Sequence, residues 1–442
     1  MLGALRGLSV FAVILLLLTG YAIARSLTLL LHDPKRRRAS IARLQGATLR
    51  RGMGFLGACF VKLGQVMSSR PDLFEPELIA ELRLLQDKLP PFAFTHVRRV
   101  LAAELGKPLD EVFAEVSELP LAAASVAQVH RGKLLSGDEV ALKVLRPSIR
   151  AQVERDGALL LLFARLLALH PTIRLSDPVG FTAEFVRGLV RQTDLRIEAE
   201  NYRIFRENFA DDPRVAFPFV YTELSGERLL VMELVRGRKL DALPPGDHGE
   251  VARALRRATL QMCLEDGFMH ADMHPGNMLL RDDGVVVLFD VGLSTRLRPE
   301  ILELFVDMIK CIAMGTPDDL LNHFKNYHLH GNNVDWGRVR ADLAQFFAKF
   351  RVQEMATLDY TEMTNEIMAL GRRYHVRPVP ELSLLLVGVV TVQGIGKMLM
   401  PEANDFEAMP AFLVPLLLKA GKPVPVSAEA QRAQKALLAS TS

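Results

Sequence analysis

The sequence has few cysteines and almost no excess of charge. Its 442 residues include three cysteines, one tryptophan and a formal net charge of +3. Cys59, Cys263 and Cys311 are far apart and lack the close spacing of zinc or disulfide motifs. We therefore expect a reducing compartment and a structural role for each cysteine. The small net charge says little about partners, and we expect no nucleic acid among them.

Internal repeats, haem motifs and the glycine fingerprint of dinucleotide-binding folds are also absent. Half of the residues are hydrophobic and 24% are charged, which is typical of a globular protein and excludes a disordered chain. The length exceeds that of one ordinary core, so we expect two or more units.

The longest uncharged segment near the N-terminus is 8–24, which is at the lower limit for a membrane-spanning helix. A basic cluster at 35–38 follows it and only Arg6 precedes it, so the positive-inside rule places the downstream side in the cytoplasm. A cleaved signal peptide is the alternative, because the segment is short and 22–24 resembles a cleavage site. The dense positive charge that follows disfavours export, so we expect a retained anchor whose basic flank can contact anionic lipid.

Residues 40–118 are predicted to be helical. Lys62 and Gln65 are three residues apart, so they share one face of an apolar helix and would need polar partners there. The alternative is an ordinary exposed helix lysine.

Residues 119–147 change to the pattern of a β-hairpin. The strand 140–143 ends in Lys143 and resembles the kinase strand whose lysine pairs the α- and β-phosphates of a nucleotide. Many strands end in lysine, so this motif alone is weak. The preceding loop is alanine-rich where kinases have glycines, and its backbone should approach phosphates less closely. We expect nucleotide contacts from the loop residues Ala122, Ala123, Ala124 and Ser125.

Two later segments fit the same interpretation. Glu198 lies on a charged, predicted helix and could form the ion pair that orients Lys143, although a solvated helix face is the alternative. The strand near 228–233 leads into a segment that resembles a kinase hinge, in which the backbone from Glu233 to Val235 would meet adenine.

The stretch 267–292 contains Asp272, Asn277 and Asp290, with a predicted hairpin between the last two. Two carboxylates and an amide oxygen suit Mg²⁺, which completes its shell with phosphate oxygens. Protein kinases use this order of residues. Two surface turns would use the same residue types, so the upstream motifs decide in favour of the kinase interpretation.

Taken together, the motifs resemble the UbiB family of atypical, protein-kinase-like proteins over roughly residues 50–400. The segments that carry the resemblance are Lys62-Leu63-Gly64-Gln65, Ser69-Arg70-Pro71-Asp72, Leu85-Gln86-Asp87, Gln128-Val129-His130 and His270 to Asn277. The resemblance implies ATP and Mg²⁺ binding, membrane association and support of ubiquinone biosynthesis. It implies a bacterial inner-membrane location with the catalytic domain in the cytoplasm, or the mitochondrial inner membrane in a eukaryote.

The resemblance also implies roles for individual residues. Lys143 would bind phosphate and Glu198 would orient it, Asp272 would act as the base or position the nucleophile, and Asn277 and Asp290 would hold Mg²⁺. Lys62, Gln65 and Asp194 would form a lid over the site, where a protein substrate would otherwise enter.

Two residues depart from the family pattern. The lid element has Gln192 where the family has a glutamate, which would leave Asp194 as the only carboxylate for Lys62. Val291 replaces the phenylalanine of the Asp-Phe-Gly motif, which changes the packing and keeps the metal ligand.

We therefore expect an α+β, protein-kinase-like, two-lobed fold with an N-terminal helical extension and an N-terminal membrane segment. The expected domains are 1–39 (anchor and basic segment), 40–118 (helical extension), 119–237 (N-lobe with inserted helices), 238–420 (helical C-lobe) and 421–442 (flexible tail). Residues 382–395 are uncharged but short, so we expect a buried helix there.

The predicted function is a membrane-associated kinase or ATPase that uses ATP and Mg²⁺ in quinone-lipid synthesis. Its expected partners are membrane lipid, quinone precursors and a biosynthetic protein complex. The alternatives are a phosphotransferase that acts on a protein or small molecule, and a pseudokinase that binds nucleotide as a scaffold.

Overall fold

The computed structural model describes residues 19–26, 28–29, 34–68, 70, 74–85, 90–170, 177–244, 248–331, 333–350 and 360–399. The chain divides into two compact units, of which the first comprises 1–204 and 218–234 and the second comprises 205–217 and 235–442. Both units combine helices with small sheets, so the mixed α/β architecture agrees with the expected class. Most of the predicted anchor, the segments 71–73 and 86–89, and the C-terminal tail lie outside the described residues.

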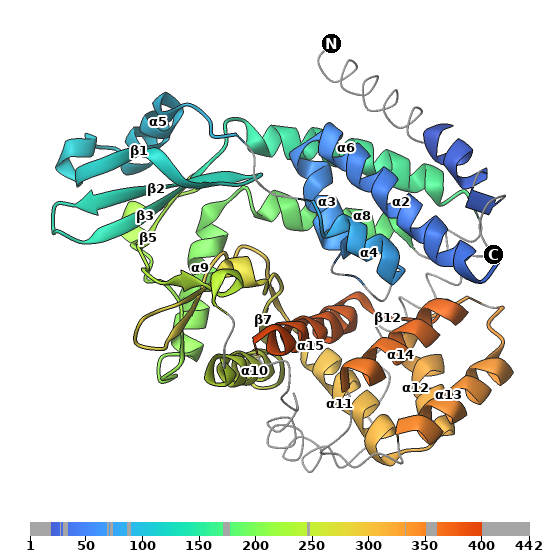
Figure 1. Ribbon diagram of the computed structural model, residues 1–442. Coiled ribbons are helices and arrows are strands. Elements are labelled where there is room, and N and C mark those ends of the chain that lie inside the picture. The colour runs from blue at the N-terminus through green and yellow to red at the C-terminus, as the bar shows by residue number, and fades with distance from the viewer. Residues whose placement is uncertain are drawn as a thin grey trace. The chain divides into compact units, whose positions relative to one another are not determined.

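The first unit begins with a group of helices in which α2 (Pro34–Leu56) packs against α3 (Ala58–Ser68) and α4 (Pro76–Leu82) (Figure 1). Gly46 allows α2 to approach α4 closely, because a Cβ at this position would lie 2.9 Å from the Leu78 carbonyl oxygen. The next helix is α5 (Phe94–Leu105), and Gly106 ends it in the left-handed conformation at φ +65°.

The sheet of the first unit has the order β1-β2-β3-β5, with every neighbouring pair antiparallel. The strands are β1 (Phe113–Ala123), β2 (Ala127–Leu134), β3 (Glu139–Leu145) and β5 (Leu229–Glu233). The predicted hairpin is therefore confirmed. The prediction of helix up to residue 118 is wrong for 113–118, because β1 starts at Phe113, whose side chain joins the core under α5.

Three further helices of the described part of the first unit follow the sheet strands β1 to β3 and lead into the second unit. They are α6 (Ile149–Leu167), α8 (Pro178–Arg191) and α9 (Leu195–Asn208), and α6 packs against α8. Asp177 caps the start of α8 by accepting a hydrogen bond from the Gly180 amide at 3.0 Å. Helix α9 contains the boundary between the two units at residues 204 and 205.

The second unit contains two small sheets that present its polar motif residues. One has the order β4-β9-β8-β6 and the other pairs β7 with β10. Their strands are β4 (Val215–Ala216), β6 (Arg238–Lys239), β7 (Phe268–His270), β8 (Met278–Leu280), β9 (Val286–Leu288) and β10 (Ser294–Arg296). The β8–β9 pairing confirms the predicted hairpin between Asn277 and Asp290, with Gly284 in its turn at φ +84°.

The rest of the described second unit is mainly helical. Its helices are α10 (Gly249–Leu264), α11 (Pro299–Met314), α12 (Pro317–Tyr327), α13 (Trp336–Phe350), α14 (Tyr360–Tyr374) and α15 (Pro380–Leu399), and β11 (His328–Leu329) pairs with β12 (Arg377–Pro378). Figure 1 shows α15 running beside α10. Leu382 and Leu385 of α15 have no exposed surface, so the prediction of a buried helix there is confirmed.

No helix in the described ranges is long and apolar enough to cross a membrane. The predicted N-terminal membrane segment therefore has no support from the structure, and its residues 8–18 lie outside the described part of the chain.

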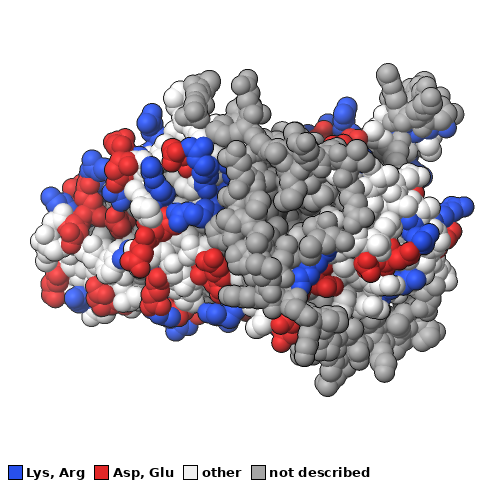
Figure 2. All heavy atoms as spheres, turned by 90° about the horizontal axis from the view of Figure 1, so that it is seen from below, with Lys and Arg blue, Asp and Glu red and all other residues white. Residues whose placement is uncertain are grey.

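Charged side chains of both signs are interspersed on the face shown in Figure 2. Surface ion pairs such as Arg98–Glu118 and Arg150–Glu227 have side chains that are 44 to 68% exposed. Pairs this exposed contribute about 0 to 1 kcal/mol each to stability, so the fold depends on its apolar cores.

Candidate functional site

A bidentate ion pair in the first unit joins Lys143 of β3 to Glu198 of α9. The Lys143 ammonium lies 2.7 and 2.8 Å from the two carboxylate oxygens of Glu198. The side chains are 15% and 5% exposed, so the pair is buried and the alternative of a solvated charge at Glu198 is wrong. A buried lysine held by both oxygens of a carboxylate has a fixed position, which is what phosphate binding requires.

The alanine-rich loop is a short connection at the end of the β1–β2 hairpin. Ala122 and Ala123 are the last residues of β1, and the Ala124 amide donates to the Ala127 carbonyl at 2.9 Å. Arg146 secures the loop because its Nε donates to the Ala124 carbonyl at 2.8 Å. Ser125 lies in the turn and is 2% exposed. The loop is therefore tightly held.

Gln128 and His130 anchor the same hairpin from inside the unit. Gln128 accepts a hydrogen bond from the Phe92 amide at 2.9 Å and donates to His130 Nε2 at 2.7 Å. His130 Nδ1 then donates to the Ser117 carbonyl at 2.8 Å. Burial lowers the pKa of His130, so its ring is neutral and both of its nitrogens are used. These two motif residues therefore have a structural role.

Helix α3 places the Lys-Leu-Gly-Gln motif against neighbouring helices. Lys62 is 9% exposed, so the alternative of an exposed helix lysine is wrong, whereas Gln65 is partly exposed. Gly64 fits between Met53 and Leu85, whose side-chain atoms would lie 2.6 and 2.3 Å from an added Cβ. The glycine of the motif therefore allows close packing around Lys62.

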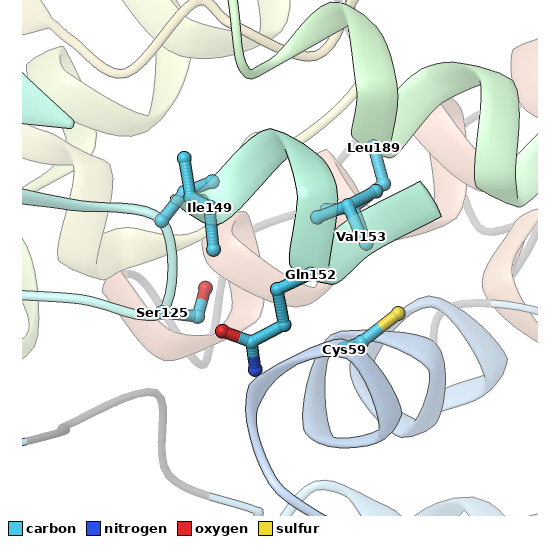
Figure 3. A pocket seen from close by; sticks show the side chains of 7 residues that line it. Cys59, Ser125, Ile149, Gln152, Val153 and Leu189 are labelled. Carbon is cyan, nitrogen blue, oxygen red and sulfur yellow. The ribbon is translucent and has the colours of Figure 1, made fainter. Parts of the chain in front are cut away.

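A small cavity connects this helix with the alanine-rich loop. Its lining includes Cys59 of α3, Ser125 of the loop and Gln152 of α6, and its volume of about 10 Å³ has room for about one water molecule. Figure 3 shows the Gln152 amide between Ser125 and the helix that carries Cys59. Helix α3 and the loop are therefore neighbours within the first unit, as a lid element requires.

Asp194 lies directly before α9 and binds a neighbour in sequence. Both of its oxygens accept hydrogen bonds from the Arg196 guanidinium, at 2.9 and 2.7 Å, and this contact holds the pKa of Asp194 below its usual value. The Oε1 atom of Gln192 is buried and has no hydrogen-bond partner in the described structure. A glutamate here would be a buried charge, so the amide suits this surrounding better.

In the second unit, His270 connects the segments that carry the predicted catalytic and metal residues. Its Nδ1 accepts from the Asp272 amide and its Nε2 donates to the Phe289 carbonyl, both at 3.2 Å. Burial lowers the pKa of His270, which keeps the ring neutral and preserves both bonds. Asp272 follows β7 and Asp290 follows Phe289, so this one ring ties together the two segments that carry the carboxylates.

Asn277 is held to the same two segments. Its Nδ2 donates to the Asp272 carbonyl at 3.2 Å, and its own carbonyl accepts from the Phe289 amide at 3.0 Å. Since the amide nitrogen is used, Oδ1 is the atom that would bind a cation. The sequence prediction that Asp272, Asn277 and Asp290 come together in one region is supported by these bonds.

Asp290 has an unusual backbone conformation, with φ at +58°. Few residues other than glycine occupy this left-handed region, and those that do often lie at functional sites. Val291, at the position of the kinase phenylalanine, has no exposed surface and therefore fills a core position.

Two backbone amides of the predicted hinge are already hydrogen-bonded within the first unit. The Glu233 amide donates to the Phe219 carbonyl at 2.8 Å and the Leu234 amide to the Glu139 carbonyl at 3.1 Å. Both donors are thus used within the first unit. An adenine ring would have to use other backbone groups of this segment, such as the amide of Val235.

The donors of the second unit fit a magnesium ion, because Asn277 and Asp290 offer the hard oxygen ligands that Mg²⁺ prefers. In the first unit, considered by itself, Lys143 offers a positive charge for phosphate. The assignment of these residues as ligands stays a prediction, and the sequence did not point to His270, whose ring contacts the Asp272 amide and the Phe289 carbonyl. His270 and Asp272 are only two positions apart, which is a local pattern that the sequence displays. The Phe289 carbonyl, which is the other partner of His270, lies 19 residues after it in the chain.

Comparison with known proteins gives consistent matches. The model of the ABC1 atypical kinase-like domain matches residues 84–322. The protein named "Probable protein kinase UbiB" of Aliivibrio fischeri is 32% identical over 390 residues, which cover 83% of this chain and 70% of the relative. The chloroplastic "Protein ACTIVITY OF BC1 COMPLEX KINASE 1" of Arabidopsis thaliana is 30% identical and is covered over 54% of its length.

The chain spans from 53% to 87% of the lengths of its Synechocystis relatives. Among solved structures, the complex of Rv3197 with erythromycin from Mycobacterium tuberculosis is 22% identical, with a TM-score of 0.49 over 70% of this chain and 84% of that one.

Proposed function

The chain belongs to the ABC1 atypical kinase-like family and has its kinase-like fold, and from this premise we propose that it is an ATP- and Mg²⁺-dependent atypical kinase or ATPase that supports ubiquinone biosynthesis. The observation that carries the proposal is the buried bidentate pair between Lys143 and Glu198. Desolvating two charges is costly, and a purely structural position could be filled more cheaply by apolar residues. A positioned ammonium is useful where phosphate oxygens must be bound.

The chemistry would follow from positioning and electrostatics. Lys143 would hold the phosphates, and Asn277 and Asp290 would hold Mg²⁺, which would neutralise the charge that develops during phosphoryl transfer. Asp272 would orient the attacking hydroxyl or water, and the His270 ring would fix the backbone of Asp272 for this task. The nucleotide loop would comprise Ala122 to Ser125, and adenine would meet the backbone near Glu233 and Val235.

The lid distinguishes this proposal from a general protein kinase. Lys62 is buried on α3, and α3 shares a cavity with the loop that carries Ser125. A helix fixed next to the nucleotide loop leaves little room for a peptide substrate. We therefore propose that the acceptor is water, a small molecule or a lipid, with Lys62, Gln65 and Asp194 forming the lid.

We also propose that the protein associates with a membrane. This would be the bacterial inner membrane, or the mitochondrial inner membrane in a eukaryote. Leu162 and Leu166 are four residues apart on α6, so they share one face of this helix, and they are 51% and 54% exposed. Exposed leucines on one face favour contact with lipid. Quinone precursors and a biosynthetic protein complex remain the proposed partners, and an N-terminal anchor remains part of the proposal.

Two other functions use the same residues. A phosphotransferase would place phosphate on an added protein or small molecule, and a pseudokinase scaffold would bind nucleotide without turnover. The presence of Lys143, Glu198, Asp272, Asn277 and Asp290 favours an active site over a scaffold.

The test is release of phosphate from ATP by the full chain with Mg²⁺, with and without anionic vesicles and a quinone-precursor mimic. We expect turnover that lipid increases and that Asp290→Asn abolishes. Transfer of the phosphate to an added acceptor would favour the phosphotransferase. Nucleotide binding without turnover under every condition would overturn the proposal in favour of the scaffold.

A further inference from the structure

A cluster of three metal-binding residue types lies in the helical part of the second unit, on residues to which no role has been given above. Asp307 and Cys311 are four residues apart on α11 and therefore share one face of that helix. His323 comes from α12, which follows after a short turn and packs against α11. One donor atom from each residue lies within 4.8 Å of the other two.

The distances suit a divalent ion after a small adjustment. Zinc bonds of about 2.0 to 2.3 Å in a tetrahedral arrangement separate the ligand atoms by about 3.3 to 3.8 Å. His323 Nδ1 is already 3.0 Å from Asp307 Oδ2. Long side-chain movements are therefore not needed to bring the three donors around one ion.

The cluster is buried on the side of His323 and accessible to solvent on the side of Asp307. The His323 side chain is 1% exposed, whereas the Asp307 side chain is 30% exposed and Cys311 is partly exposed. The ion can enter from the open side, and water can complete its coordination there.

Only one ring nitrogen of His323 has a hydrogen-bond partner among the described residues. Its Nδ1 contacts Asp307, but its Nε2 is buried and has no hydrogen-bond partner among the described residues. Because Nδ1 is the nitrogen that faces Asp307, it is the ring atom that an ion shared with Asp307 would bind. An Asp–His pair next to a thiol is typical of a metal centre, where carboxylates bind or orient a ligating imidazole.

We propose that Asp307, Cys311 and His323 form a binding site for a divalent metal ion of the zinc class. The thiolate and imidazole select zinc over Mg²⁺, which prefers oxygen ligands, so this site is chemically different from the one proposed for Asn277 and Asp290. An ion held by all three residues links α11 to α12. It therefore stabilises this helical hairpin and leaves the nucleotide chemistry unchanged.

The experiment uses the full chain after chelator treatment, titrated with Zn²⁺ by calorimetry and with Co²⁺ by absorption spectroscopy. We expect one ion per chain, a higher unfolding temperature with Zn²⁺, and a cobalt spectrum with a thiolate charge-transfer band. Mg²⁺ at the same concentration should give no thiolate band and should not displace Co²⁺ from the thiolate site.

Three variants locate the site. Cys311→Ser should weaken Zn²⁺ binding by at least about tenfold and remove the cobalt–thiolate band. The double variant Cys59→Ala/Cys263→Ala, in which Cys311 is the sole thiol, should keep the band. Asp290→Asn should keep it as well. Since Cys311 is partly exposed, its serine variant should fold, and its unfolding temperature without metal provides the check.

Absence of stoichiometric Zn²⁺ binding by the parent chain would overturn the proposal. An unchanged affinity in Cys311→Ser would also overturn it, because the ion would then bind elsewhere.

Discussion

The carboxylate of Glu198 contacts the ammonium of Lys143 with both of its oxygens, although the two residues are 55 positions apart in the chain. We expect Lys143→Ala to abolish nucleotide turnover because the phosphate contact is lost. The same change removes the ammonium that both oxygens of the buried Glu198 carboxylate contact, so it should also lower the free energy of unfolding, by about 3 to 5 kcal/mol at most. Turnover and denaturant unfolding of the same preparation measure the two effects.

A double variant separates these two losses. In Lys143→Met/Glu198→Leu both charges are replaced by apolar groups, so the unfolding free energy should return close to that of the parent chain. Turnover should stay absent. Recovery of activity in the double variant would show that Lys143 has no role in phosphate binding.

Asp290 combines a predicted metal ligand with a left-handed backbone. Asp290→Asn should abolish Mg²⁺-dependent turnover and change stability little, because asparagine tolerates positive φ. Asp290→Ala should lose turnover as well and should unfold about 1 to 2 kcal/mol more easily, since alanine is strained there. Calorimetry of the two variants distinguishes the backbone effect from the loss of the ligand. Equal stability of the two would contradict the strained conformation.

The buried histidines predict a loss of stability in mild acid. Burial holds the pKa values of His130 and His270 below 6.5, so the unfolded chain binds protons first as the pH falls. Stability is therefore present in full above about pH 6.5 and declines from there down to the folded-state pKa values. Unfolding temperatures between about pH 7.5 and 5.5 should show this decline.

The contribution of His130 can be isolated. His130→Asn should give a shallower dependence on pH over this range, even if its stability at neutral pH is lower. The exposed His170 provides the control, because His170→Asn should reproduce the parent profile. Identical slopes for all three proteins would argue against His130 as a source of the acid sensitivity.

Two glycines of α2 should respond oppositely to the same substitution. A Cβ at Gly46 would lie 2.8 Å from the Glu81 Cβ and 2.9 Å from the Leu78 carbonyl, so Gly46→Ala should destabilise the unit by about 1 to 3 kcal/mol. Gly54 has no atom within 4 Å of an added Cβ, so Gly54→Ala should stabilise it by about 0.5 to 1 kcal/mol. Chemical denaturation of both variants tests the close approach of α2 and α4.

Residue patterns predicted the hairpins and the Lys143–Glu198 pair because each is marked by local periodicity or by a family motif. They failed at residues 113–118, because these six residues show no clear helical or strand periodicity of their apolar side chains. The segment forms a strand because the Phe113 side chain packs into the core under α5. They also missed the contacts of His270, whose partner carbonyl belongs to Phe289, directly after β9. Cysteine spacing gave no hint of the Asp307–Cys311–His323 cluster, because its third member comes from the neighbouring helix.

The hydrogen bond between Gln128 and the Phe92 amide has a consequence for the modularity of the chain. The Gln128 side chain is 1% exposed, so a fragment that began after Phe92 would contain a buried amide without its main-chain partner. We therefore do not expect the sheet to fold as a separate fragment without the residues that precede it. Any exchange or transplantation of this part between relatives has to carry the two segments together.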